Sequence, residues 1–170
     1  LGSDGLPVVR VKPPTGEWVR IDGARPEAEA ALQVDRALGG AAVPPVVAVI
    51  GVGFGYVVDE VRRRRPDVRV VALEVLPELL PHWRARVDVA AYEAAGTLVV
   101  GAEPAFELPS AAWPADVLAP DPLVLVHPAL AHYFPDAAGR ARVALAQFMF
   151  ERRANEEARQ RLLEELWLPL

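Results

Sequence analysis

The chain has 170 residues, 52% hydrophobic and 24% charged, with a formal net charge of −5 and no cysteine. This length suits one domain with its own core. The acidic balance argues against a nucleic-acid binder, and the lack of cysteine excludes disulfides and thiolate metal sites. No apolar run approaches the roughly 18 residues of a membrane span, and the N-terminus lacks the charged-then-apolar order of a signal peptide. We expect a cytoplasmic protein without membrane partners; the many Ala, Arg, Val and Pro are typical of a GC-rich bacterial genome.

The N-terminal region predicts a β-hairpin followed by a helix. Residues 8–12 and 18–21 alternate apolar and polar side chains, and a Pro-Pro-Thr-Gly loop separates them. Pro26 suits the first position of a helix, which Gly39 and the glycine after it would end. We therefore expect residues 1–25 to form a hairpin appendage and residues 26–170 to form one α/β domain ending in a long helix.

The stretch 46–74 is typical of the start of a nucleotide-binding α/β fold. An apolar, β-branched run leads to three alternating glycines, Gly51, Gly53 and Gly55. A helical pattern follows, and a second apolar run ends at Glu74. A strand, a tight glycine turn, a helix and a strand in this order begin a doubly wound sheet.

The rest of the chain repeats the alternation of helices and strands. We expect a helix over 77–95, a strand over 97–100, an irregular segment over 104–122 with a short helix around Phe106, and a strand over 123–126. A long helix should follow Pro135 and Asp136 and reach about residue 166. This order predicts a parallel sheet, and continuously apolar strands predict helices on both of its faces. The expected fold class is a Rossmann-like, three-layer, doubly wound α/β fold with an N-terminal β-hairpin.

The glycine spacing favours one kind of cofactor over another. A dinucleotide dehydrogenase would place its third glycine at position 56, which is Tyr56 here. The spacing is closer to that of an S-adenosylmethionine site, in which the glycines would let the backbone approach the ligand. Glu74 would then accept the ribose hydroxyls, and Glu103, after the third strand, would meet the adenine amine. The alternative is that the glycines serve only strand-to-helix packing and both acids are solvated.

Other polar residues carry weaker signals. His127 follows the fourth strand, where it could act as a base or as a structural residue. Asp121 and Asp136 are expected to be a turn acid and a helix N-cap. The four arginines at 62–65 suit the solvated carboxyl end of a helix. The three histidines have no metal-ligand spacing, and with no Ser-His-Asp or Cys-His set we assign no catalytic residue.

Several of these pieces coincide with one family. They are residues 16–22 (Gly-Glu-Trp-Val-Arg-Ile-Asp), 26–30 (Pro-Glu-Ala-Glu-Ala), 50–56 (Ile-Gly-Val-Gly-Phe-Gly-Tyr) and 71–74 (Val-Ala-Leu-Glu). Together they resemble the N-terminal Rossmann-like region of the motility-associated factor (Maf) glycosyltransferases and their MptE-like relatives. Residues 127–129 and 152–155 resemble the region before the catalytic domain of that family. The His-Ser pair that relatives often carry is absent, because residues 21–24 read Ile-Asp-Gly-Ala.

The resemblance implies a piece of an enzyme that transfers nonulosonic acids to flagellin Ser or Thr, with the sugar-transfer site in the following domain. Our leading interpretation is a non-catalytic module that positions this downstream catalytic domain or a partner protein, with a small nucleotide-like ligand. The first alternative is a class I methyltransferase with S-adenosylmethionine as cofactor. The second is an interaction domain whose crevice is filled by Phe54 or Tyr56.

Overall fold

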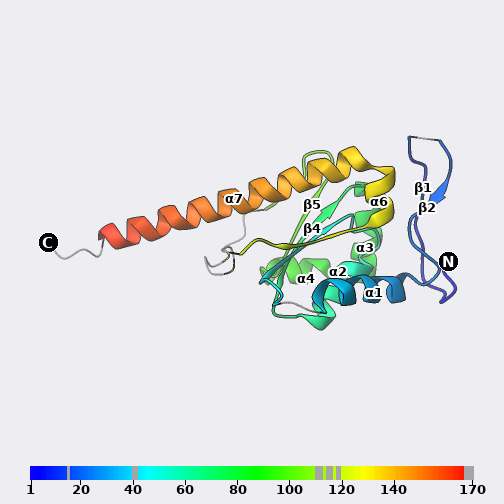
Figure 1. Ribbon diagram of the computed structural model, residues 1–170, viewed down its shortest axis with the longest axis horizontal. Helices are drawn as coiled ribbons and strands as arrows, with labels where there is room; N and C mark the ends of the chain where they lie inside the picture. Colours follow the sequence, from blue (N-terminus) through cyan, green and yellow to red (C-terminus); the bar gives the residue numbers. More distant parts are fainter. Residues whose placement is uncertain (15, 40–41, 110–112, 114–116, 118–119, 167–170) are drawn as a thin grey trace.

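A four-stranded parallel sheet forms the centre of the computed structural model, which describes residues 1–14, 16–39, 42–109, 113, 117 and 120–166 (Figure 1). The strands lie in the order β5-β4-β3-β6. Their bounds are β3 Val46–Ile50, β4 Arg69–Glu74, β5 Leu98–Ala102 and β6 Leu123–Val126. The sheet and its flanking helices confirm the predicted Rossmann-like α/β fold class.

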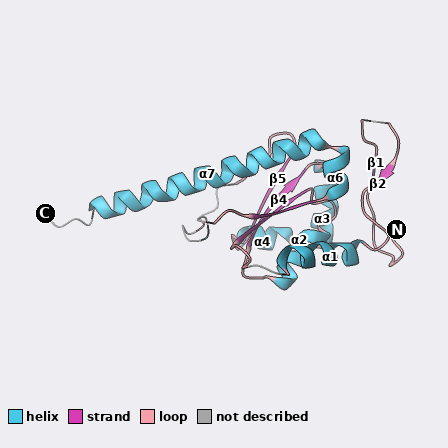
Figure 2. Cartoon of the chain, in the orientation of Figure 1, coloured by secondary structure: helices cyan, strands magenta, loops and turns pink. Residues whose placement is uncertain are grey.

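Helices cover both faces of the sheet (Figure 2). One face carries α1 (Pro26–Leu38), α2 (Tyr56–Arg64), α3 (Leu80–Arg86) and α4 (Val89–Ala94), and the other carries α6 (Pro128–Tyr133) and α7 (Pro135–Leu166). Successive residues of β3 belong to different clusters: Ile50 packs with the α7 side and Val49 with the α2 side. Alternate side chains of a strand point to opposite faces, so the apolar run of β3 reflects burial on both.

The strand order creates a topological switch point. From β3 the chain moves outward through β4 to β5, and it then returns to add β6 on the other side of β3. The crossovers therefore diverge at the carboxyl ends of β3 and β6. Ligands of open α/β sheets bind in the crevice at such a point.

The N-terminal hairpin is present but short. Strand β1 (Arg10–Val11) pairs antiparallel with β2 (Val19–Arg20). Val9, Val11 and Ile21 are buried in the same hydrophobic cluster as the first half of α7. Residues 1–25 thus pack onto the sheet domain through their own apolar side chains.

Three local predictions differ from the structure. The helix expected over 77–95 is divided into η1 (Pro77–Leu79), α3 and α4. The division arises because Val87 is extended and the side chain of Asp88 caps α4 by accepting a hydrogen bond from Ala91 N at 3.0 Å.

The other two differences concern single residues. Phe106 lies in a turn with a positive φ of 49° instead of a helix. Asp136 lies inside the first turn of α7 instead of at its N-cap, because Pro135 takes the first helical position. Residues 110–112, 114–116, 118 and 119 of the segment predicted to be irregular lie outside the described residues.

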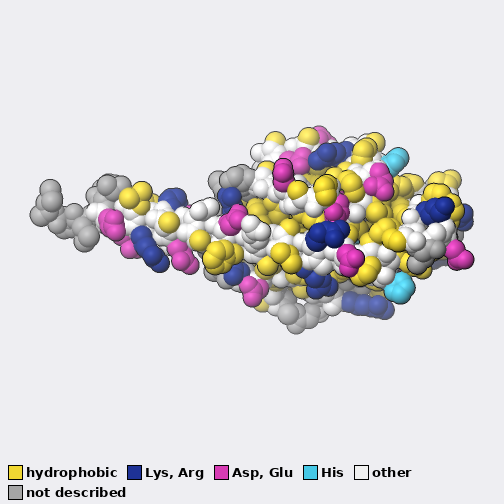
Figure 3. Space-filling view, turned by 90° about the horizontal axis from the view of Figure 1, so that it is seen from above, with side chains coloured by type: hydrophobic (Ala, Val, Ile, Leu, Met, Phe, Trp, Pro, Cys, Tyr) yellow, Lys and Arg dark blue, Asp and Glu magenta, His cyan; other side chains and the backbone are white. Residues whose placement is uncertain are grey.

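Helix α7 has 32 residues and extends past the sheet, as Figure 1 shows, and its far end forms a narrow arm in the space-filling view (Figure 3). At 1.5 Å per residue it is about 48 Å long. Its first half buries Ala141, Leu145, Phe148 and Met149, whereas no residue between Phe150 and Glu165 is buried. The second half is therefore a projection with little contact to the domain. Within the described residues no helix has the length and apolarity needed to cross a membrane.

Candidate functional site

The glycine turn joins β3 to α2, and its three glycines do different work. All three have positive φ, at 80°, 59° and 82° for Gly51, Gly53 and Gly55. A Cβ on Gly51 would lie 2.8 Å from the Leu130 side chain, and one on Gly55 would lie 2.1 Å from the Trp83 ring. A Cβ on Gly53 would meet nothing within 4 Å. The first and third glycines thus pack the turn against α6 and α3, and only Gly53 borders open space.

Glu74 lies at the tip of β4, as predicted, but its carboxylate is fully buried. One oxygen accepts a hydrogen bond from Gly53 N at 2.5 Å, and the other accepts one from Leu76 N at 2.7 Å. Both oxygens are therefore used to hold the glycine turn and the chain that follows β4. Because the side chain is fully buried, a ribose could reach this carboxylate only after the chain around it had opened.

Burial also changes the ionisation of Glu74. Desolvation disfavours the charged carboxylate and raises the pKa of Glu74 to about 7, against the opposing effect of backbone N–H donors that include those of Leu76 and Gly53. In the unfolded chain the same group has its ordinary pKa near 4.5. The native state consequently keeps a proton that the unfolded state loses as the pH rises between these two values.

This difference predicts a pH-dependent stability. Between pH 4.5 and 7 the native state binds more protons than the unfolded state, so the contribution of Glu74 is fully present below 4.5 and is lost as the pH rises through 7. The loss is about 3 kcal/mol in the free energy of unfolding. Urea unfolding at several pH values gives the free energy of unfolding as a function of pH. Over this pH range the free energy should fall more steeply with pH for the parent than for Glu74→Gln, whose side chain does not titrate. Parallel curves over this range would contradict the prediction.

Glu103 follows β5, as predicted, but its side chain points toward α7. Its Oε1 accepts a hydrogen bond from Nε of Arg140 in α7 at 2.9 Å, and Nη2 of the same arginine lies 2.7 Å from this oxygen in an ion pair. The backbone N–H of Glu103 donates to the backbone oxygen of Glu74 at 3.0 Å. The structure thus brings Gly53 and Glu74 together and leaves the Glu103 carboxylate in a separate ion pair.

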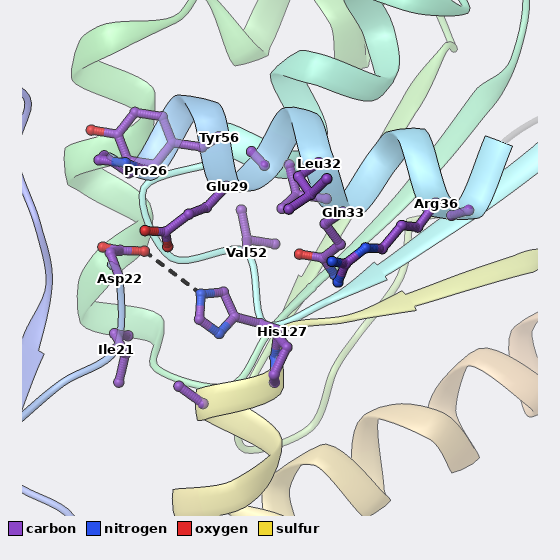
Figure 4. A pocket seen from close by; sticks show the side chains of 15 residues that line it. Ile21, Asp22, Pro26, Glu29, Leu32, Gln33, Arg36, Val52, Tyr56 and His127 are labelled. Carbon is purple, nitrogen blue, oxygen red and sulfur yellow. Dashed lines mark ion pairs between the residues drawn. The ribbon is translucent and has the colours of Figure 1, made fainter. Parts of the chain in front are cut away.

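A cavity of about 550 Å³ lies at the switch point, between α1 and the N-terminus of α6 (Figure 4). Ten of its fifteen lining residues are apolar. Its polar groups are Asp22, Glu29, Gln33, Arg36 and His127. We call it the α1–α6 cavity. None of the five predicted cofactor-binding residues belongs to its lining, whereas Val52 and Tyr56, their neighbours in the chain, do.

His127 forms part of this cavity in a structural role. Its Nδ1 accepts a hydrogen bond from Leu130 N at 3.4 Å and thereby caps α6. Its Nε2 lies 3.6 Å from Oδ1 of Asp22, whose other carboxylate oxygen accepts from Val9 N at 2.8 Å. Both ring nitrogens face protein groups, so the geometry favours the structural alternative over a general base. Asp22 and His127 link the hairpin to α6 across the cavity.

Tyr56 and Phe54 leave the cavity open. The Tyr56 hydroxyl donates to the Pro7 backbone oxygen at 2.9 Å, and its ring forms a wall of the α1–α6 cavity. Phe54 packs edge-on against Tyr56 and against His82. The hydrogen bond to Pro7 fixes the Tyr56 ring at the wall, so the ring does not fill the α1–α6 cavity.

The basic run lies at the carboxyl end of α2, as predicted, and the structure adds that its side chains are paired. Arg63 donates two hydrogen bonds to Glu60, and Arg65 donates two to Asp67. The Arg62 guanidinium lies 3.7 Å from the ring centroid of Tyr92. These cations therefore meet groups of this chain at the negative end of the helix.

The fold and the cavity together define a parallel, Rossmann-like α/β domain with a pocket at its switch point. Sequence reasoning missed Asp22 and Arg36 as members of this site. A usable signal for Arg36 was the spacing of Glu29, Gln33 and Arg36, which places all three on one helix face.

No group of three His, Cys, Asp or Glu in the described part of the chain could hold a metal ion. Searches against protein-family models, curated proteins and solved structures give no match to this chain.

Proposed function

We propose that this chain is an N-terminal, non-catalytic module of a Maf-type protein glycosyltransferase that acts in the cytoplasm and positions a downstream catalytic domain. The observation that carries the proposal is the second half of α7. It projects from the domain with Leu162 and Leu163 exposed at 57% and 41%. Most helices in proteins are stabilised by packing of one face against the rest of the protein, and this half of α7 has no buried residue between Phe150 and Glu165. Such a projecting helix suits a connection to further protein.

The state of the glycine turn also supports a non-catalytic role. Both carboxylate oxygens of Glu74 accept hydrogen bonds from backbone N–H groups. Gly51 and Gly55 are needed where the turn packs closely against Leu130 and Trp83. These residues stabilise the fold without offering groups to a substrate. In the proposed protein the sugar-transfer chemistry belongs to the following domain.

The proposal has a direct test in the complete protein. The reading frame is expected to continue past Leu170 into a glycosyltransferase domain, and the complete protein to increase the mass of flagellin in cells that lack their own copy. Ala158→Pro should lower this modification severely, because proline inside a helix costs about 3 kcal/mol. Ala154→Gln, also exposed on α7, is the matched control and should leave it unchanged. A stop codon after Leu170, or full modification by Ala158→Pro, would contradict the proposal.

The second candidate is a class I S-adenosylmethionine-dependent methyltransferase. It is favoured by the position of the glycine turn at the end of β3 and of Glu74 at the tip of β4. Calorimetry with S-adenosylmethionine and S-adenosylhomocysteine distinguishes the two functions. We expect no heat at millimolar ligand, because the Glu74 carboxylate is buried and paired. Micromolar binding that is weakened in Glu103→Gln would favour the methyltransferase.

A further inference from the structure

The α1–α6 cavity has the properties of a ligand site. It lies where the crossovers diverge between β3 and β6, which is the usual ligand position in an open α/β sheet. Its volume of about 550 Å³ falls within the range of small-molecule pockets, and its walls are mostly apolar with a few polar groups. The three glycines, Glu74 and Glu103 do not line this cavity, so their predicted roles do not explain it.

Most polar groups of the cavity already have partners in the protein. Glu29 accepts a hydrogen bond from Gly23 N at 2.9 Å, and Gln33 Nε2 donates to the Val126 backbone oxygen at 3.1 Å. Asp22 accepts a hydrogen bond from Val9 N and His127 accepts one from Leu130 N, and the other Asp22 oxygen lies 3.6 Å from His127 Nε2. A ligand cation would therefore have to compete with existing bonds for either carboxylate.

Arg36 differs from these groups. It lies in the last turn of α1 and extends along the cavity beside Gln33 (Figure 4). Its guanidinium has no ion pair or hydrogen bond to any residue that the structure describes. The charge suits the negative end of α1, but that interaction leaves its five N–H donors available. Seven residues of helix, about 10 Å, separate Arg36 from Glu29, which limits repulsion between Glu29 and an anion bound at Arg36.

We propose that the α1–α6 cavity binds a small organic anion. Its carboxylate or phosphate group pairs with the Arg36 guanidinium, and its apolar body lies against Ala30, Val52 and Ala129. The free oxygen of Gln33 is available to a hydroxyl or amine on the ligand. This inference is independent of the proposed glycosyltransferase role, since it rests only on the cavity and its unpaired cation.

Titration of the isotopically labelled chain tests the proposal by methyl NMR. The probes are 3-phenylpropanoate, phenyl phosphate and the neutral 3-phenylpropanamide. Both anions are expected to shift the methyl signals of Ala30, Ala37 and Ala129 at millimolar concentration, while Ala158 on the distal part of α7 stays unchanged. The amide should bind about tenfold more weakly, since it loses the charge-assisted pair. Tighter binding of the carboxylate or of the phosphate identifies which anionic group the site takes.

Two exposed arginines supply the variants. Arg36→Gln should weaken binding of both anions about tenfold and leave the amide unaffected. Arg25→Gln removes the same charge just before α1, outside the cavity lining, and should bind like the parent. The proposal is overturned if neither anion shifts the cavity methyls at about 10 mM, a concentration at which even a weak fragment registers. Equal binding of the anion by the parent and Arg36→Gln also overturns it.

Discussion

Replacement of Glu74 by alanine is expected to lower the free energy of unfolding by about 3 kcal/mol or more. The substitution leaves the backbone N–H groups of Gly53 and Leu76 buried without an acceptor, and each such group costs about 1–3 kcal/mol. The fully buried side chain also leaves a cavity, which adds to the loss. Because Gly53 N depends on this carboxylate, the glycine turn should loosen first.

Urea unfolding at pH 6 measures this loss, and hydrogen exchange at Gly53 and Leu76 reports the loosened turn. Glu103→Ala is the matched control, since it also removes a strand-end acid but one that pairs with a half-exposed Arg140. The Glu103 side chain is 14% exposed, but its carboxylate meets the Arg140 side chain and no backbone N–H group among the described residues. The control should therefore lose less than Glu74→Ala, because it leaves no buried backbone donor without an acceptor. Equal losses in the two variants would show that Glu74 does not brace the turn.

Gly55→Ala is expected to destabilise the domain by about 3 kcal/mol. An alanine there must take a φ of 82°, and its Cβ would overlap the ring of Trp83 at 2.1 Å. The left-handed conformation costs about 1–2 kcal/mol, and overpacking costs typically about 1–3 kcal/mol more. Trp83 is fully buried and donates through Nε1 to Asp59 at 3.1 Å, so it cannot move aside without losing that bond.

Gly53→Ala separates the cost of the left-handed backbone from the cost of overpacking against Trp83. Its φ of 59° imposes the same kind of backbone penalty, but no atom lies within 4 Å of the added Cβ. We expect a loss of about 1 kcal/mol from the backbone alone. Thermal unfolding and tryptophan fluorescence of both variants check the comparison, with a spectral change only in Gly55→Ala. Similar losses of unfolding free energy in Gly53→Ala and Gly55→Ala would mean that the Trp83 ring moves aside without destabilising the domain.

Most of the fold follows from patterns that are local in the chain. The apolar runs at 46–50 and 68–73 predict the buried strands β3 and β4, and Pro26 marks the start of α1 correctly. The helix over 77–95 was predicted without its break, because Asp88 competes with helix continuation through a cap that the apolar periodicity does not reveal. Local signals succeed wherever one residue's conformational preference decides the outcome.

The site is less predictable, because its parts come from distant segments. The sequence correctly places three glycines in a turn with Glu74 at the next strand tip. It does not say that Glu74 faces Gly53 N from 21 residues away, or that Trp83 fills the space against Gly55. A carboxylate at a strand tip has the same sequence signal whether it faces solvent, a ligand or a backbone amide.

The sequence by itself determines that this chain forms a parallel α/β domain with a glycine turn after its first core strand, because strand, turn and helix preferences act over a few neighbouring residues. Only the tertiary structure decides what the turn is used for. The position of β6 beside β3 sets the switch point, and the packing of α1 over it brings Asp22, Arg36 and His127 to one cavity. Burial then turns Glu74 from a strand-end acid into the brace of the glycine turn, since a fully enclosed carboxylate must bond to the backbone around it.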